Sequence, residues 1–438
     1  MLIARSDFAY VARARSLRML FSVVCGAALA GCSKGSGGSL PLPAGVPDGA
    51  ISSLVAAQRP NESFMLDPWT SAGFKSIYAF KGGMDGASPQ ANLVELNGVF
   101  YGTTVSGGGS DNDGTVFEVS KSGSERVLYS FKGGTDGASP EASLIAVDGK
   151  LYGTTRFGGD GPSGGNGTVF EVSTSGKERI LHRFKGGLDD GAFPYANLIA
   201  VNGALYGTTE EGGGPTGGGG TVYEVSTSGN ESVIYHFKNQ PDGAYPLAGL
   251  IALNGELYGT TAGGGTLNGT VFEVSTSGEE NVLYTFKGRL DGETPAANLI
   301  ALNGKLYGTT TYGGSVNPSI SNGTVFEVSL SGRERILHRF QAGLDGASPL
   351  AGLIAVRGEL YGTTYFGGTA APSSHGNGIV FEVNKSGQES VLHRFQGGTE
   401  GGNPAAGLIA AGGALYGTTS DAGLSSASGD GTVFKISP

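Results

Sequence analysis

The amino-acid sequence predicts an all-β fold, a seven-bladed β-propeller with four antiparallel strands in each blade. Three observations predict it. Glycine supplies 81 of the 438 residues, well above the usual share of about 7%, which favours a chain with many tight turns. Sequence motifs recur seven times at a regular spacing. Each period contains four short runs of strand-forming residues, which is typical of propeller blades.

Three motifs define the repeat. Tyr-Gly-Thr-Thr recurs with a mean period of 52.5 residues, starting at Tyr101, Tyr152, Tyr206, Tyr258, Tyr307, Tyr361 and Tyr416. A motif close to Gly-Thr-Val-Phe-Glu-Val-Ser starts at Gly114, Gly167, Gly220, Gly269, Gly323, Gly378 and Gly431. Asp-Gly-Ala-x-Pro starts at Asp85, Asp136, Asp190, Asp242, Asp291 and Asp345, with a degenerate seventh copy at Glu400. Because the three motifs agree on seven copies, we expect seven structural units.

The second copy shows the four strands that we expect in each blade. Residues 142–147 are a short apolar run, and Asp148-Gly149 is a dipeptide that favours a type I′ hairpin. Residues 150–155 form the returning strand, residues 167–173 alternate with a period of two, and residues 178–184 form the outer strand.

The order of the motifs predicts how the ring closes. The first strand of the repeat, residues 74–80, is of the outer class, whereas the chain ends on residues 431–437, which are of the third class. We therefore expect the N-terminal strand to complete the last blade, so that no blade edge stays unpaired.

These motifs resemble those of a known family. The inner strand ending in Asn-Gly or Asp-Gly and the tyrosine of the second strand resemble kelch-type propellers, but the glycine pair directly after the second strand and the fourth-strand tryptophan of that type are missing. The closer resemblance, over residues 74–438, is to the bacterial tandem-repeat family named GloVer. That resemblance implies a cell-surface location and no established activity.

The N-terminus has the features of a lipoprotein signal peptide. Four arginines precede an apolar stretch over residues 19–30, which is too short to span a bilayer as a helix. It ends in Leu-Ala-Gly-Cys32, which resembles a bacterial lipobox, so we expect residues 1–31 to be removed and Cys32 to be acylated. An ordinary secreted protein with a chance cysteine is the alternative. We expect residues 32–72, which end near Trp69, to be a flexible tether to the membrane, and residues 73–438 to be the propeller.

Net charge and cysteine content restrict the partners. The formal net charge is −10, and removal of residues 1–31, with a net charge of +3, leaves −13. This balance disfavours nucleic acid, which needs basic patches, and fits a cation or a neutral glycan better. Ser33 after the lipidated cysteine favours the outer membrane, by resemblance, so we expect a location in the bacterial cell envelope, periplasmic or surface-exposed. Cys25 falls in the leader, so no intramolecular disulfide is possible in the mature protein. We expect the domain to be monomeric.

Repeated titratable residues have two interpretations. The aspartates of Asp-Gly-Ala-x-Pro form an acidic ring that suits calcium, or each accepts a backbone N–H in its own turn. The second interpretation is favoured, because a residue present in every blade usually serves the blade. By the same reasoning we expect interblade hydrogen bonds from the strand-three glutamates, Glu118, Glu171, Glu224, Glu273, Glu327 and Glu382. Three of the outer-strand histidines, His182, His338 and His393, interchange with tyrosines, so we expect packing and hydrogen bonding rather than a metal site.

Candidate ligand-binding residues are those that break the repeat. They are aromatic and polar residues of the loops after Tyr-Gly-Thr-Thr and polar residues where the inner strands begin: Gln90, Asn92, Glu141, Ser143, Arg156, Phe157, Tyr195, Asn197, Asn298, Tyr312, Tyr365 and Phe366. Exposed aromatics beside amides suit stacking on sugar rings, although the aromatics can equally pack under their own loops.

The sequence holds no phosphate loop, HExxH zinc motif or nucleophile elbow in the required context. We therefore expect a surface-anchored binding or interaction module for a glycan or a protein, without catalytic residues, cofactor or metal. The alternative is an extracellular enzyme, a hydrolase or lyase, that degrades polysaccharide.

Overall fold

The computed structural model describes residues 73–159, 164–214, 218–317, 321–369, 376–421 and 429–437. The chain divides into two units, residues 1–63 and 64–438, and all described residues belong to the second. Within the described part, no helix has the length and apolar character needed to span a bilayer. The predicted leader, Cys32 and the tether with Trp69 lie outside the described residues.

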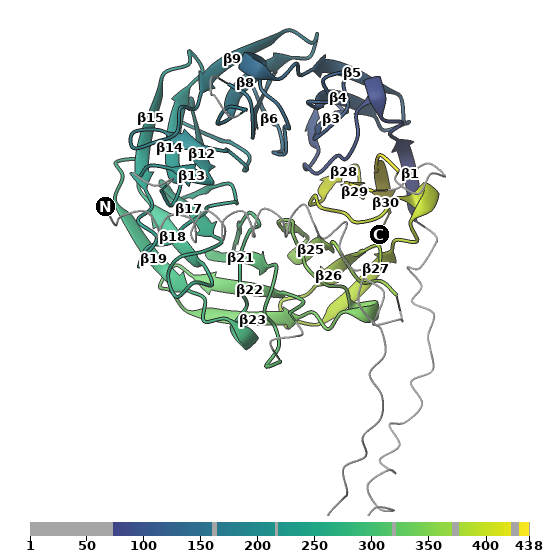
Figure 1. The fold of residues 1–438 in the computed structure, drawn as a ribbon. Helices are drawn as coiled ribbons and strands as arrows, with labels where there is room; N and C mark the ends of the chain where they lie inside the picture. The colour runs from purple at the N-terminus through teal and green to yellow at the C-terminus, as the bar shows by residue number, and fades with distance from the viewer. Residues whose placement is uncertain are drawn as a thin grey trace, which may run out of the picture. The chain divides into compact units, whose positions relative to one another are not determined.

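Seven four-stranded antiparallel sheets are arranged around one axis as the blades of a propeller (Figure 1). The predicted fold class is confirmed. Blades are numbered along the chain, and their strands are given from the inner to the outer edge. Blade 1 is β2 (Val94–Leu96), β3 (Val99–Thr104), β4 (Thr115–Ser120) and β5 (Glu125–Ser130); blade 2 is β6 (Ile145–Val147), β7 (Lys150–Thr155), β8 (Thr168–Ser173) and β9 (Glu178–Arg183); blade 3 is β11 (Ile199–Val201), β12 (Ala204–Thr209), β14 (Thr221–Ser226) and β15 (Glu231–His236).

The remaining blades follow the same order. Blade 4 is β16 (Ile251–Leu253), β17 (Glu256–Thr261), β18 (Thr270–Val274) and β19 (Glu280–Thr285); blade 5 is β20 (Ile300–Leu302), β21 (Lys305–Thr310), β22 (Thr324–Ser329) and β23 (Glu334–Arg339); blade 6 is β24 (Ile354–Val356), β25 (Glu359–Thr364), β26 (Ile379–Val383) and β27 (Glu389–Arg394); blade 7 is β28 (Ile409–Ala411), β29 (Ala414–Thr419), β30 (Thr432–Ile436) and β1 (Phe74–Ala79). Single 3-10 turns are η1 (Gly83–Asp85), η2 (Gly134–Asp136), η3 (Arg289–Asp291), η4 (Gly343–Asp345) and η5 (Gly398–Glu400).

The predicted closure is confirmed. β1 pairs with β30 in antiparallel register, from Phe74 opposite Ile436 to Ala79 opposite Thr432. Two backbone bonds extend this pairing, from Phe80 N–H to the carbonyl of Gly431 and from Ser437 N–H to the carbonyl of Gly73. The N-terminal strand is therefore the outer strand of blade 7.

The tyrosine and glycine of Tyr-Gly-Thr-Thr serve packing within one blade. In blade 2, Tyr152 donates its hydroxyl to Glu171 at 3.1 Å. Gly153 lies against the ring of Phe170, where a Cβ would meet the ring at 2.7 Å. A side chain at this position would therefore displace a fully buried phenylalanine.

The two threonines connect sheets and strands. Thr154 donates to the carbonyl of Ala196 in blade 3 at 3.3 Å, and Thr155 shares a hydrogen bond of 2.8 Å with Thr168 on the neighbouring strand. Both threonines are buried, so each bond satisfies a hydroxyl that would otherwise be costly to bury.

One predicted contact is wrong. The strand-three glutamates were expected to bond between blades, but Glu171 bonds Tyr152 and Arg179 of its own blade. The register explains this, because Tyr152 and Arg179 both lie directly opposite Glu171. The link between blades comes instead from Arg179, which donates to the carbonyl of Thr227 at 2.8 Å.

The inner strands are shorter than expected. Residues 142–144 were predicted as strand, but β6 begins at Ile145. The segment before it bonds to blade 1 instead: the hydroxyl of Thr103 donates to the carbonyl of Ala142, and the side-chain hydroxyl of Ser143 accepts the N–H of Asn92. Neighbouring inner strands also contact each other around the axis.

The core lies in the seams between blades. Each buried cluster combines residues of two neighbouring blades. In the first seam, Phe131 packs edge-on against Phe170, with ring centroids 5.1 Å apart, and six other seams repeat this pair. Because burying one such side chain contributes about 1.5–3 kcal/mol, stability depends on every blade having both neighbours.

Candidate functional site

The Asp-Gly-Ala-x-Pro loops and the loops after Tyr-Gly-Thr-Thr share one face of the propeller. In blade 1 the two loops form a backbone bridge between Ala87 and Ser106, and blade 3 extends the equivalent bridge into two short strands, β10 (Gly191–Ala192) and β13 (Glu211–Gly212). We call this the loop face. The face that carries the turns between first and second strands, such as Asn97-Gly98, is called the hairpin face.

The acidic ring of the loop face is engaged in its own turns. Each carboxylate accepts the N–H of a residue four or five positions earlier, at 2.6 to 3.2 Å. The acceptors are Asp85, Asp136, Asp190, Asp242, Asp291, Asp345 and Glu400. The interpretation of these residues as turn-forming is confirmed.

The interchange of tyrosine and histidine is explained by the same carboxylates. Tyr78 donates to Asp85 at 2.6 Å, and at the equivalent place His338 lies 3.2 Å from Asp345. Both side chains also pack edge-on against the next phenylalanine of the outer strand. The predicted packing and hydrogen-bonding role is confirmed.

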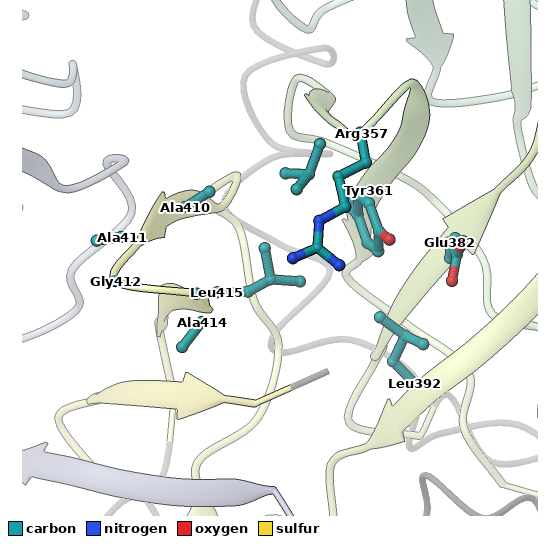
Figure 2. A pocket seen from close by; sticks show the side chains of 11 residues that line it. Arg357, Tyr361, Glu382, Leu392, Ala410, Ala411, Gly412, Ala414 and Leu415 are labelled. Atoms are coloured by element: carbon teal, nitrogen blue, oxygen red, sulfur yellow. The ribbon is translucent and has the colours of Figure 1, made fainter.

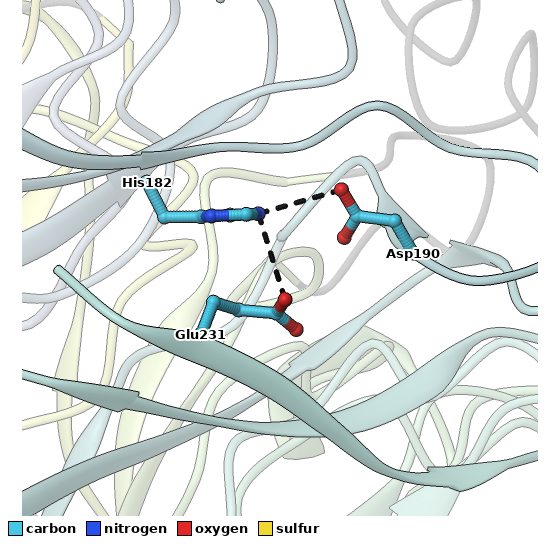
Figure 3. Close-up of side chains that lie close together, drawn as sticks. All are labelled: His182, Asp190 and Glu231. Atoms are coloured by element: carbon cyan, nitrogen blue, oxygen red, sulfur yellow. Dashed lines mark ion pairs between the residues drawn. The ribbon is translucent and has the colours of Figure 1, made fainter.

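One histidine lies between two carboxylates. His182 is 3.4 Å from Asp190 and 3.9 Å from Glu231, which belongs to the outer strand of the next blade (Figure 3). The three ligand atoms lie within 4.8 Å of one another, close enough to hold a metal ion. In the preceding seam Tyr129, Asp136 and Glu178 occupy the equivalent positions, so the arrangement is a feature of the seam.

A glutamate at the start of the outer strand closes most of these seams. Burial, followed by the charge of the neighbouring aspartate, raises the pKa of four of these glutamates to about 7. The pKa of Glu231 is also raised to about 7, by burial and then by the charge of Asp190, with His182 opposing the rise. These seam glutamates are Glu125, Glu178, Glu231, Glu280 and Glu334. At the seventh seam Phe74 replaces the glutamate and stacks on His393 with a centroid distance of 4.0 Å.

The seam glutamates predict that the melting temperature falls from pH 5 to pH 8. A glutamate with a pKa of about 7 in the folded state and 4.5 in the unfolded state favours folding when protonated, so its contribution is lost as the pH rises through 7. Solvent screening of these half-buried groups reduces each contribution to about 1 kcal/mol. In thermal melts, Glu178→Gln with Glu334→Gln should flatten the slope, whereas the exposed control Glu279→Gln should not. A slope of the opposite sign contradicts the prediction.

Four predicted residues form two separate hydrogen-bonded groups where the inner strands begin. Asn92 accepts the N–H of Gly407 of blade 7, and Ser143 accepts the N–H of Asn92. Asn298 accepts the N–H of Gly249 and donates to Asn197, two blades away. These side chains position neighbouring inner strands, and their role in ligand binding stays a prediction.

Other predicted residues meet at the mouth of the axis on the loop face. Arg156 lies 3.2 Å from Glu141 of its own blade and 2.9 Å from Glu210 of blade 3. The three side chains are only 15%, 10% and 9% exposed. Burial raises the pKa of Glu141 against the opposing charge of Arg156, while the two carboxylates outweigh burial and raise the pKa of Arg156.

Aromatic rings surround the guanidinium. Arg156 lies 5.3 Å from the ring centre of Phe157 and 5.1 Å from that of Tyr195, distances at which cation–π attraction operates. Burial, then Glu141 and Glu210, and then Tyr365 of blade 6 raise the pKa of Tyr195, with Arg156 opposing them. We call Glu141, Arg156, Phe157, Tyr195 and Glu210 the mouth cluster.

The remaining predicted residues lie around this cluster or apart from it. Tyr365 packs edge-on against Phe366 at 4.8 Å and bonds Asp421. Gln90 is half-buried at the blade 1 position equivalent to Glu141. Tyr312 is half-buried beside its backbone bridge to Glu293 in blade 5, outside the cluster.

The mouth is asymmetric. The position after the motif proline carries Gln90, Glu141, Tyr195, Leu247, Ala296, Leu350 and Ala405, from blade 1 to blade 7. The position after Tyr-Gly-Thr-Thr carries Val105, Arg156, Glu210, Ala262, Thr311, Tyr365 and Ser420. At these two positions, charged side chains thus occur only in blades 2 and 3, and the other blades carry uncharged residues. Alignment of the seven copies at these two positions reveals the charged residues, including Glu210, whose ion pair with Arg156 the motifs alone do not indicate.

The hairpin face holds a separate cavity of about 440 Å³ between blades 6 and 7 (Figure 2). Arg357, Tyr361 and Glu382 of blade 6 line it together with the Ala410–Leu415 hairpin of blade 7. None of these residues was predicted to bind a ligand, because Tyr361 and Glu382 belong to motifs that recur in other blades.

The model of the Gloeobacter/Verrucomicrobia repeat matches residues 57–268, 109–320, 160–373 and 317–438. The matched ranges overlap and together cover residues 57–438. No curated protein sequence matches significantly. The kelch-like type stays a prediction.

Several solved structures share the fold at low identity. A Xanthomonas campestris gluconolactonase is 13% identical over 83% of this chain and 89% of that chain, with a TM-score of 0.41. PorZ, a surface component of the type-IX secretion system of Porphyromonas gingivalis, is 15% identical over 82% of this chain and 47% of that chain, with a TM-score of 0.46. A Penicillium chrysogenum α-L-arabinanase is 12% identical over 67% and 92%, with a TM-score of 0.40. These similarities concern the fold alone.

Proposed function

The chain belongs to the Gloeobacter/Verrucomicrobia repeat family, and on this premise we propose that it is a binding module held at the bacterial cell envelope, with its ligand docking at the mouth cluster. The repeated motif residues described above bond or pack within the propeller. Function on such a scaffold belongs to residues that break the repeat.

The asymmetric mouth is the observation that carries this proposal. Two buried carboxylates and a buried guanidinium are costly to desolvate, and apolar residues of similar volume would often give equal or greater stability. Blade 4 has such residues at the same two positions, Leu247 and Ala262, both buried. The fold therefore does not require the charges of blades 2 and 3, and recognition of a ligand explains them.

A neutral glycan fits the chemistry of the mouth. Aromatic rings such as Tyr195 and Phe157 stack on the apolar face of a sugar, and the charged groups beside them accept and donate hydrogen bonds to hydroxyls. The mouth cluster carries one positive and two negative charges, which disfavours polyanions, including nucleic acid. Binding of this kind needs no cofactor and no second copy of the chain.

A glycan array together with a hydrolysis assay tests the proposal. We expect the purified protein to bind neutral glycans and to release no product from them. Tyr195→Leu, which introduces the residue found at this position in blade 4, should weaken binding about tenfold or more, equivalent to 1.4 kcal/mol. Tyr312→Leu, outside the cluster, serves as the control. Silence on every glycan, with capture of a protein instead, would replace the glycan by a protein ligand.

An enzyme is the second candidate, since Glu141 and Glu210 flank one cation as asymmetric carboxylates. Glycoside hydrolysis requires one carboxylic acid and one carboxylate about 5–10 Å apart. Both carboxylates here are held by Arg156, which favours binding over proton transfer. Product release that Glu141→Gln abolishes would establish the enzyme instead.

We also propose that Cys32 carries the membrane anchor, after removal of residues 1–31, and that residues 32–72 tether the propeller. The lipobox-like sequence that ends at Cys32 supports this proposal, and multiple acyl chains give stable anchoring. Labelled fatty acid should enter the wild-type protein and not Cys32→Ser, and only the wild-type protein should sediment with membranes. Equal labelling of both proteins contradicts the proposal.

A further inference from the structure

The cavity on the hairpin face is next to the first hairpin of blade 7, whose residues around the turn are small, Ala411, Gly412, Gly413 and Ala414. The turn residue is Asn97, Asp148, Asn202, Asn254, Asn303 or Arg357 in blades 1 to 6, and Gly412 in blade 7. All seven have a φ of 50° to 56°, so the backbone conformation is retained and only the side chain is lost. Ala411 and Ala414 replace bulkier residues beside this turn in most other blades.

The glutamate that lines this cavity has counterparts that bind cations. In blade 2, Glu171 holds Lys150 at 2.9 Å and Arg179 at 3.0 Å. In blade 5, Glu327 holds Lys305 at 2.8 Å and Arg335 at 3.1 Å. The lysine begins the second strand and the arginine lies opposite the glutamate on the fourth strand.

Blade 6 has neither of these cations. Glu359 occupies the place of the lysine, and Ser390, directly opposite Glu382, occupies the place of the arginine. Burial, followed by the charge of Glu359, raises the pKa of Glu382, against a hydrogen bond from Tyr361. Among the described residues, Glu359 Oε2 is buried without a hydrogen-bond partner and no cation lies within 4 Å of either carboxylate. Glu382 thus lines an open cavity with no cation in contact with its carboxylate, and the charge of Glu359 acts on it.

The other walls restrict the ligand further. Arg357 lies between Tyr361 and Leu415 in Figure 2, and Leu392 and the alanines of the blade 7 hairpin supply apolar surface. A volume of about 440 Å³ admits a molecule the size of one sugar ring or one amino acid, near the lower end of the range for ligand pockets.

We propose that this cavity is a second binding site, which takes a small ligand carrying a protonated primary amine. The ammonium group replaces the lysine and arginine of blades 2 and 5 against Glu382 and Glu359, and Arg357 binds an oxygen acceptor on the body of the ligand. An amino sugar and a diamino acid share this chemistry. The site is on the face opposite the mouth cluster and does not depend on the function proposed there.

Calorimetric titration of the full-length protein tests the proposal with four probes. We expect D-glucosamine or L-lysine to bind with a Kd on the order of 1 mM or tighter. The fully acetylated counterparts, N-acetylglucosamine and Nα,Nε-diacetyl-lysine, have no free amine and should bind at least tenfold more weakly. The amine that binds identifies the ligand as sugar or amino acid. Equal binding of acetylated and free forms overturns the proposal, as does the absence of saturable binding by both amines.

A matched pair of variants locates the site. Glu359→Lys with Ser390→Arg installs the cations of blade 2, and it should abolish amine binding while the melting temperature stays equal or rises. Glu256→Lys with Asn281→Arg makes the same change at the equivalent positions of blade 4, where the adjoining hairpin keeps Asn303, and it should leave amine binding unchanged. Loss of binding in both variants, or in neither, overturns the proposal.

Discussion

Removal of residues 74–79 is expected to lower the melting temperature of the whole propeller by on the order of 10 °C or more, rather than to fray one edge. The deletion removes the strand that pairs with β30 over its length and the stack of Phe74 on His393. It also exposes the seam between blades 6 and 7 and the seam between blades 7 and 1, because β1 contributes to both clusters. Differential scanning calorimetry of the deletion against the parent chain measures the effect.

Point variants keep this prediction testable if the deletion does not fold. Phe80→Ala empties a fully buried position that packs against Phe117 of blade 1 at 5.0 Å, and it should cost about 3–5 kcal/mol. Lys75→Ala on the same segment, at an exposed position, should cost little. Cooperative unfolding of the deletion at the temperature of the parent would mean that β1 does not close the ring.

Replacement of Arg156 by alanine is expected to destabilise the folded protein by about 3–5 kcal/mol, because it leaves two buried carboxylates without their counter-charge. The loss should depend on pH. Burial already raises the pKa of Glu141 against the opposing charge of Arg156, so without the guanidinium this pKa should rise further, and the carboxyl is tolerated when protonated and costly when ionised. Urea denaturation at pH 5 and pH 8 should therefore show a larger loss at pH 8.

A triple variant separates lost charge balance from lost packing. Glu141→Gln and Glu210→Gln together with Arg156→Met remove all three charges at similar volume, and stability should return to within about 1.5 kcal/mol of the parent. Lys150→Ala, which breaks a more exposed ion pair, should cost about 0–1 kcal/mol. A loss in Arg156→Ala that is the same at both pH values contradicts the electrostatic explanation.

The sequence could predict the fold because sevenfold repetition makes its signals redundant. The limits of β7 agree with the expected residues 150–155, and every second strand ends at the last threonine of Tyr-Gly-Thr-Thr. Two predictions were wrong, because hydrogen-bond partners on a neighbouring blade or strand determine the structure at those residues. Residues 142–144 bond to blade 1 instead of forming a strand, and Glu171 bonds within its own sheet.

The candidate site was partly accessible from the sequence. Glu141, Arg156 and Tyr195 were recognised because they differ from the other copies, but their convergence with Glu210 depends on loop geometry across two blades. The cavity between blades 6 and 7 was missed for a different reason. The cavity arises because Gly412 replaces a larger turn residue and because Ser390, not arginine, lies opposite Glu382. Such replacements by smaller residues are detected only when the copies are aligned position by position.

The central claim is that residues common to the blades maintain the fold, whereas residues that break the repeat at the mouth bind the ligand. A symmetrised mouth tests it most directly: Glu141→Leu, Arg156→Ala, Tyr195→Leu and Glu210→Ala give blades 2 and 3 the residues of blade 4. Melting temperature and glycan binding are measured on this variant, on Arg156→Ala and on the parent chain. We predict a higher melting temperature than that of Arg156→Ala alone, because the buried charges are removed together, and complete loss of binding. Retained binding, or loss of stability without loss of binding, would contradict the account.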